Sequence, residues 1–190
     1  MDPLYGLVAC GGQSSRMGFD KSSIIYHRVP QRYHVYEMLQ PYCERIFISC
    51  NSEQSASILP GHHFIVDSEK AQHCGPMAAL VSAFEQFPEA SFLVVACDYP
   101  FLQSEDIKRL VAVRQSDRPA VCYFSSSGFE EPLIAIYENA IRNKLVEEFN
   151  KGRYSLRSVL RSVNAFHCST LSELNITSVD NTKTFDELKR

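Results

Sequence analysis

Glycines, hydroxyls and two cations are concentrated in one stretch near the start of the chain, which reads GGQSSRMGFDK at positions 11–21. Glycines let a backbone approach an anion closely and aim N–H groups at it. Arg16 and Lys21 add positive charge that can offset a phosphate. The apolar run 4–10, typical of a buried strand, leads directly into this loop, so the segment predicts a phosphate-binding site. The alternative is a strand-to-helix turn that needs glycine for its shape and carries solvated cations.

The spacing of this loop differs from the two commonest phosphate-binding motifs. A P-loop has four residues between its first glycine and its Gly-Lys-Ser/Thr. Here five residues separate Gly12 from Gly18, and two more precede Lys21. The sequence also lacks Gly-x-Gly-x-x-Gly, which excludes the dinucleotide fingerprint.

Composition indicates an ordinary globular protein with one core, because 45% of the 190 residues are hydrophobic and 22% are charged. The net charge of −3 argues against sequence-independent binding of nucleic acid. A local basic mouth of Arg16, Lys21, Arg28 and Arg32 could still receive a small anionic substrate. No apolar run reaches the length of a membrane span and no signal peptide opens the chain. We therefore expect a cytoplasmic protein with neither nucleic-acid nor membrane partners.

The seven cysteines are an odd number, are widely spread and form no Cys-x-x-Cys. This pattern supports neither a structural zinc site nor a disulfide framework. Cys10, Cys50, Cys97 and Cys122 fall within or beside expected strands, where a thiol acts as a small hydrophobe. We expect them to be reduced and structural.

Expected strands and helices alternate along the chain, which predicts an α/β fold. We expect strands near 4–10, 45–50, 63–66, 92–96, 119–124, 131–137 and 163–167, and helices near 30–42, from 76 onward, and near 105–115, 138–150, 155–162 and 184–189. The order predicts a Rossmann-like, three-layer α/β/α fold around a mostly parallel sheet. Strands 119–124 and 131–137 are close enough to form a small antiparallel excursion. No repeat or linker divides the chain, so residues 1–190 are expected to form a single domain.

Polar residues follow several of the expected parallel strands. In an open α/β sheet, ligands bind where the strands deliver their carboxyl ends. The loop after Cys10, the residues Ser49 and Asn51, and the carboxylates of Asp67 and Asp98 should therefore share one rim.

Asp98 lies directly at the end of a buried strand, where a carboxylate is poorly solvated unless a cation meets it. Magnesium in phosphate chemistry is usually bound by one or two carboxylates together with substrate phosphates. Asp98 is therefore the expected metal ligand. The alternative, a cap on the following helix, is weaker because Ser104 is better placed for it. For Asp67, an Asx turn at a strand end remains an open alternative to a role in binding.

Residues 9–21 resemble the opening motif of the molybdenum cofactor guanylyltransferases, a family of MobA-like nucleotidyltransferases: Leu-Ala-Gly-Gly-x-Ser-x-Arg-Met-Gly-x-Asp-Lys. Only Ala9 and Cys10 depart from it. Further segments resemble the family in order, up to about residue 188: 49–51, 67, 75–80, 97–102, 131–137 and 151–157. Two departures stand out. Residues 28–31 replace the family's Gly-Lys-Pro-Leu, and near the end Asn181 is kept while Lys183 replaces a second asparagine.

The resemblance implies roles for particular residues. Lys21 and Arg16 would stabilise the pyrophosphate, Asp98 would hold Mg²⁺, and Asn181 would face a pterin acceptor. The nucleotide would be contacted by Ala9, Cys10, Gly11, Gly12, Lys21, Ser49, Asn51, Asp67 and Asp98.

The resemblance also implies a reaction: a magnesium-dependent nucleotidyltransferase of molybdenum cofactor biosynthesis that joins GMP from GTP to molybdopterin, with or without molybdenum. The products would be molybdopterin guanine dinucleotide and pyrophosphate, and the product would pass to cofactor insertion proteins and molybdoenzymes. One alternative is a related nucleotidyltransferase that uses CTP or a sugar-phosphate acceptor. Another is a catalytically silent nucleotide-binding module, against which the presence of both Lys21 and Asp98 speaks.

Overall fold

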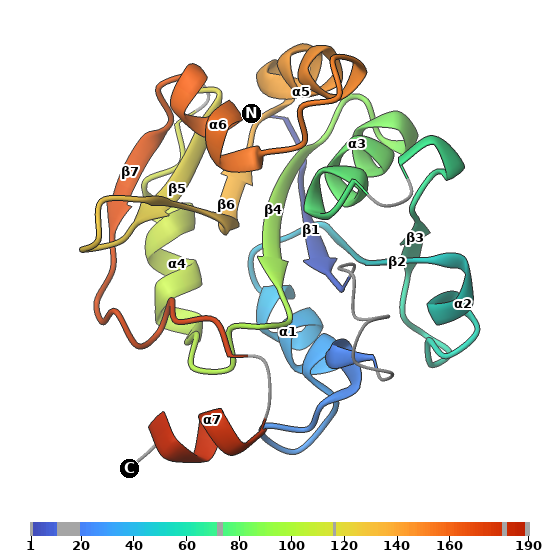
Figure 1. The fold of residues 1–190 in the computed structure, drawn as a ribbon, viewed down its shortest axis with the longest axis vertical. Helices are drawn as coiled ribbons and strands as arrows, with labels where there is room; N and C mark the ends of the chain where they lie inside the picture. Colours follow the sequence, from blue (N-terminus) through green and yellow to red (C-terminus); the bar gives the residue numbers. More distant parts are fainter. Residues whose placement is uncertain (1, 11–19, 72–73, 116, 180–181, 189–190) are drawn as a thin grey trace.

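A seven-stranded sheet forms the centre of the computed structural model, which describes residues 2–10, 20–71, 74–115, 117–179 and 182–188 (Figure 1). The strand order is β3-β2-β1-β4-β6-β5-β7. The strands are β1 (Leu4–Ala9), β2 (Arg45–Cys50), β3 (Phe64–Val66), β4 (Ser91–Ala96), β5 (Ala120–Phe124), β6 (Glu130–Tyr137) and β7 (Phe166–Ser169).

One described strand, β6, reverses direction within an otherwise parallel sheet. It pairs antiparallel with both β4 and β5, whereas β3-β2, β2-β1, β1-β4 and β5-β7 are parallel pairs. The expected antiparallel excursion is therefore confirmed, and it is confined to one strand that is inserted beside the central β4.

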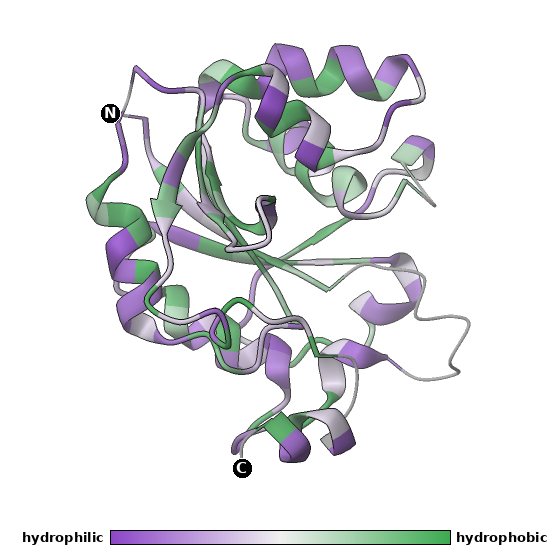
Figure 2. Ribbon diagram, turned by 60° about the vertical axis from the view of Figure 1, so that its left-hand side comes forward, coloured by the Kyte–Doolittle hydropathy of each residue, from purple (hydrophilic) through white to green (hydrophobic). Residues whose placement is uncertain are grey.

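Helices cover both faces of the sheet and complete the expected three layers (Figure 2). Helices α1 (Gln31–Leu39) and α4 (Ser104–Ala112) pack on one face. The other face carries α3 (Pro76–Gln86), α5 (Arg142–Asn150) and α6 (Leu156–Ser162). The shorter helices are α2 (Ser52–Ser55), α7 (Thr182–Leu188) and the 3-10 turns η2 (Lys21–Ser23), η3 (Glu69–Ala71) and η4 (Asn139–Ile141). Within the described residues, no helix combines the length and apolar character needed to cross a bilayer.

The core lies on both sides of β1 and β4, whose residues are all buried. Phe84 of α3 meets Phe92 of β4 edge-on, with ring centroids 4.9 Å apart, a favourable aromatic geometry. On the opposite face, a Cβ at Gly6 would lie only 3.1 Å from Leu39 of α1. Glycine at this position therefore lets α1 pack closely against β1.

Two local expectations are wrong, and both errors occur at helix ends. The cap of α4 is Gln103, which forms a capping box with Asp106, so Ser104 is the first helical residue rather than the cap. The last strand begins about three residues later than the expected 163–167. The reason is that the C-terminal cap of α6 extends to residue 165. Asn164 has a φ of 51°, and the N–H of Ala165 donates to the Leu160 carbonyl, so these residues belong to the helix end and not to the strand.

Candidate active site

The carboxyl ends of β1 to β4 meet at one edge of the sheet. Because these four strands are parallel neighbours in register, Ala9 pairs with both Ser49 and Ala96. Cys10 and Cys97, the next residues along, bring their Sγ atoms to 3.2 Å. The exit of β1 toward the glycine-rich segment thus lies directly beside the residue that precedes Asp98. The expected common rim is confirmed for the described residues.

Some of the expected site residues cannot be placed on this rim. Gly11, Gly12, Arg16 and Asn181 lie outside the described residues. Ala9 and Cys10 are placed, as the last residue of β1 and its continuation.

Lys21 is held next to an aspartate that acts as a structural anchor. Asp20 caps η2 by accepting hydrogen bonds on Oδ1 from the backbone N–H of Ser22 at 3.0 Å and from its hydroxyl at 2.8 Å. The same oxygen accepts from Gln54 Nε2 at 3.0 Å, and Oδ2 accepts from Arg32 Nη1 at 3.2 Å. Four donors therefore fix the position from which the Lys21 side chain begins.

Arg32 is buried and belongs to this anchor rather than to a basic mouth. Its guanidinium pairs with Asp20 and also donates to the hydroxyl and the carbonyl of Ser57, each at 3.1 Å. A guanidinium with these partners is not available to a substrate. The expectation that Arg32 lines an anion entrance is therefore wrong, whereas Arg28 is exposed.

Ser49 and Asp67 form a polar pair at the ends of β2 and β3. The hydroxyl of the fully buried Ser49 donates to Asp67 Oδ1 at 2.8 Å. Burial raises the pKa of Asp67 above its ordinary value, and the hydrogen bond from Ser49 offsets part of that rise. The pair holds a carboxylate in a fixed orientation at the rim, which suits recognition of ribose hydroxyls or base N–H groups.

Asn51 has a structural role that the sequence interpretation missed. Its side-chain oxygen accepts from the backbone N–H of Gln54 at 2.7 Å, and the Gln54 side chain accepts from the Asn51 N–H at 3.0 Å. This capping box starts α2. Since Gln54 also donates to Asp20, the box connects the end of β2 to the anchor beside Lys21.

The Asp98 carboxylate is contacted by a segment that is distant in sequence. Ser178 Oγ donates to Asp98 Oδ2 at 2.9 Å, and the N–H of Val179 donates to the Asp98 carbonyl at 2.6 Å. Asp98 is partly exposed, and a carboxylate oxygen is a ligand that Mg²⁺ prefers. Among the described residues no group of three or more His, Cys, Asp or Glu gathers as a metal cage. One rim carboxylate fits an ion that takes its other ligands from phosphates and water.

A second carboxylate, Glu131, lies close to Asp98 and was singled out in the sequence only as part of a motif. It accepts a hydrogen bond at 2.7 Å from the hydroxyl of Tyr99, the residue after Asp98. Burial raises the pKa of Glu131, and both the Tyr99 bond and the nearby Arg157 act in the opposite direction. The pair links β6 to the Asp98 loop.

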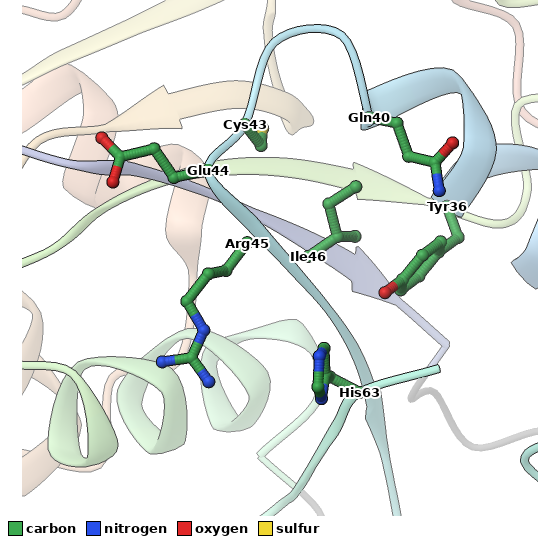
Figure 3. Close-up of a pocket in the computed structure, with 7 residues that line it drawn as sticks. All are labelled: Tyr36, Gln40, Cys43, Glu44, Arg45, Ile46 and His63. Carbon is green, nitrogen blue, oxygen red and sulfur yellow. The ribbon is translucent and has the colours of Figure 1, made fainter. Parts of the chain in front are cut away.

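A separate pocket of about 280 Å³ lies near the amino end of β2, opposite the rim (Figure 3). It is lined by Tyr36, Gln40, Cys43, Glu44, Arg45, Ile46 and His63. The guanidinium of Arg45 lies 5.0 Å from the ring centres of both Phe47 and Phe87. Arg45 thus packs on aromatic rings, and none of the expected site residues lines this pocket.

Known proteins resemble the chain in both sequence and fold. It is 36% identical to a "Molybdenum cofactor biosynthesis bifunctional protein" of Synechocystis over 71% of this chain, but the match spans only 39% of that relative. It is 26% identical to a "Molybdenum cofactor guanylyltransferase" of Pseudomonas putida over 89% of each chain.

Solved structures share the fold at lower identity. The molybdopterin-guanine dinucleotide biosynthesis protein A of Archaeoglobus fulgidus superposes with a TM-score of 0.75 at 20% identity, covering 97% of this chain and 96% of the other. A 2-C-methyl-D-erythritol 4-phosphate cytidylyltransferase of Thermus thermophilus superposes with a TM-score of 0.70 at 10% identity, covering 100% and 98%. Residues 6–168 match the family model of the MobA-like NTP transferase domain. The chain therefore belongs to the MobA-like NTP transferases and is a nucleotidyltransferase.

Proposed function

We propose that this nucleotidyltransferase joins GMP from GTP to molybdopterin and releases pyrophosphate. The observation that carries the proposal is the contact between Cys10 and Cys97, whose Sγ atoms are 3.2 Å apart. It brings the entrance of the glycine-rich segment beside a carboxylate that can hold a metal. The choice of GTP and molybdopterin is supported by the names of the relatives and by the motifs shared with the guanylyltransferases.

The proposed reaction needs alignment of phosphates more than it needs a protein nucleophile. An oxygen of the acceptor's terminal phosphate attacks the α-phosphorus of GTP, the bond from that phosphorus to the β-bridging oxygen breaks, and pyrophosphate leaves. Positioning and charge neutralisation account for most catalysis in such transfers. In this proposal Lys21 and Arg16 bind the β- and γ-phosphates, while backbone N–H groups near Gly11 and Gly12 hold the nucleotide.

Asp98 is the residue proposed to hold Mg²⁺. A magnesium ion held there would neutralise charge that develops on the phosphate oxygens during transfer. Ser178 donates a hydrogen bond to the Asp98 carboxylate, and the backbone N–H of Val179 donates to its carbonyl. Both bonds hold the Asp98 segment at the rim.

The base and the acceptor are proposed to lie on either side of these phosphates. At the ends of β2 and β3, Asn51 and Asp67 would face the ribose and base, and the buried Ser49 would contribute by orienting Asp67. Asn181 would face the pterin. We also propose that residues 1–190 act as one MobA-like NTP transferase domain, whose product passes to cofactor insertion proteins and molybdoenzymes.

The test is pyrophosphate release measured with GTP, CTP and ATP in turn, with Mg²⁺ and molybdopterin present. We expect release with GTP that depends on molybdopterin and disappears when EDTA removes the metal. Asp98→Asn should lose this release, and its matched control is Asp117→Asn, which should release pyrophosphate like the wild type. Asp117 is an exposed aspartate before β5, at the opposite edge of the sheet. Pyrophosphate release with CTP but not with GTP would contradict the assignment as a guanylyltransferase. GTP binding without pyrophosphate release would contradict the proposed transfer to molybdopterin.

A further inference from the structure

The chain after β7 returns to the candidate site and contacts Asp98 from 80 residues away. Two consecutive residues make the contact: Ser178 donates its hydroxyl to the carboxylate, and Val179 donates its N–H to the carbonyl. One tail segment therefore bonds to both the side chain and the backbone of a single rim residue.

This tail segment is fixed by a small hydrophobic cluster separate from the main core. Val179, Phe185 and Tyr26 form its buried centre. The Phe185 ring stacks on Phe101 with centroids 4.8 Å apart and packs against Tyr26 at 5.1 Å. The Tyr26 hydroxyl donates to the Val179 carbonyl at 3.1 Å. The cluster thus joins the segment after Lys21, the segment after Asp98 and the tail.

The stacking partner of Phe185 lies close to Asp98 in the sequence. Phe101 follows Asp98 by three residues, and its ring is stacked on that of Phe185. Aromatic rings bury a large contact area. The packing of Phe185 on Phe101 therefore holds the tail beside the Asp98 segment.

We propose that Ser178 is a positioning residue, whose hydroxyl sets the orientation in which the Asp98 carboxylate meets a divalent cation. The inference rests on the proposed function, in which Asp98 is the metal ligand. The terminal torsion of aspartate has a broad, roughly two-fold minimum, so a carboxylate without a fixed donor rotates readily. A hydrogen bond at 2.9 Å on Oδ2 restricts that rotation before the metal arrives.

The first test measures Mn²⁺ binding by calorimetry in the presence of a non-hydrolysable GTP analogue. Loss of a residue that orients a metal ligand typically weakens metal binding by 10–100-fold, so we expect Ser178→Ala to weaken it about tenfold. Ser178→Thr keeps the hydroxyl and should restore most of the affinity. Thr177→Ala is the matched control, because that hydroxyl donates to the Glu173 carbonyl at 2.8 Å and not to Asp98.

The second test separates positioning from a merely structural role. In pyrophosphate release, Ser178→Ala should require more Mg²⁺ for half-maximal rate, while the KM for GTP at saturating Mg²⁺ stays near the wild-type value. A purely structural role would lower the unfolding temperature and leave the Mg²⁺ requirement unchanged.

Three outcomes would overturn the proposal. They are wild-type Mn²⁺ affinity in Ser178→Ala, an equal loss in Thr177→Ala, and a Ser178→Thr variant as weak as the alanine variant. If Asp98→Asn binds Mn²⁺ like the wild type, the metal role of Asp98 falls and the Ser178 proposal falls with it. If metal binding behaves as expected but molybdopterin yields no pyrophosphate, only the proposed acceptor reaction fails.

Discussion

Two aspartates lie at the same rim, yet their surroundings direct them to different tasks. Asp20 accepts hydrogen bonds on both carboxylate oxygens from the Ser22 backbone and hydroxyl, Gln54 and the buried cation Arg32. The Asp98 carboxylate accepts a hydrogen bond from a neutral hydroxyl, that of Ser178. Pairing with a guanidinium already neutralises the Asp20 carboxylate, whereas a hydrogen bond from a hydroxyl group adds no compensating charge. The comparison teaches that a buried guanidinium partner commits Asp20 to the fold, and it supports the metal role proposed for Asp98.

The largest expected effect is at Asp98, the proposed metal ligand. Asp98→Asn keeps an oxygen that can accept from Ser178 but removes the charge that would hold a metal. Turnover should fall about 10²- to 10³-fold, the range typical of a lost electrostatic contact to a transition state. Pyrophosphate release checks the rate and thermal unfolding checks the fold, with Asp117→Asn as control. Near-normal turnover would remove Asp98 from the mechanism.

Asp20→Ala should act on stability instead, because it leaves the buried Arg32 guanidinium without its counter-charge. Breaking a buried ion pair by removing one partner typically destabilises a protein by about 3–5 kcal/mol. Because Asp20 is partly exposed, we expect a loss of about 3 kcal/mol, at the lower limit of that range. Urea unfolding measures the loss. The double variant Asp20→Ala/Arg32→Met should recover part of it. A loss for the single variant no larger than that of an exposed Asp117→Ala would mean that Asp20 is not an anchor.

Lys21→Ala should weaken binding of the triphosphate about tenfold, since an ammonium contact to phosphate is charge-assisted. The four hydrogen bonds to Asp20 remain in this variant, and thermal unfolding checks that the fold is kept. Calorimetry with GTP and Mg²⁺ measures the affinity. Lys108→Ala removes an exposed cation on α4 and serves as the control. If both variants bind GTP like the wild type, Lys21 is only a surface charge.

The smallest expected effect is the pH dependence contributed by Asp67. Burial raises the pKa of this carboxyl, so on acidification it takes up a proton at a higher pH than an ordinary aspartate. A nucleotide contact that needs the carboxylate is complete above that pKa and is lost as the pH falls through it. GTP affinity, measured by titration from about pH 8 downward, should therefore begin to decline at a higher pH than an ordinary aspartate would cause. Asp67→Asn should bind more weakly at neutral pH and with a flatter profile; an equally steep profile would assign the decline to another group.

The sequence by itself determined the parts of this protein that rest on short-range patterns. Alternation of apolar and polar segments predicted the strands and helices, and the errors lie mainly at helix ends. One example is the end of α6 at Asn164, which shifts the start of β7. The rule that parallel strands present their carboxyl ends together predicted the rim shared by Cys10, Ser49, Asp67 and Asp98. Each of these inferences needs only neighbouring residues and a general rule of sheet topology.

Only the tertiary structure decided which rim residues serve structure and which remain for chemistry. Arg32 reads as a surface cation in the sequence, but packing of α1 buries it against Asp20 and Ser57. Ser178 carries no motif, yet the tail brings its hydroxyl to Asp98 across 80 residues. Such contacts depend on how distant elements pack, and packing depends on the whole core rather than on any local pattern, so charge and spacing along the chain could not reveal them.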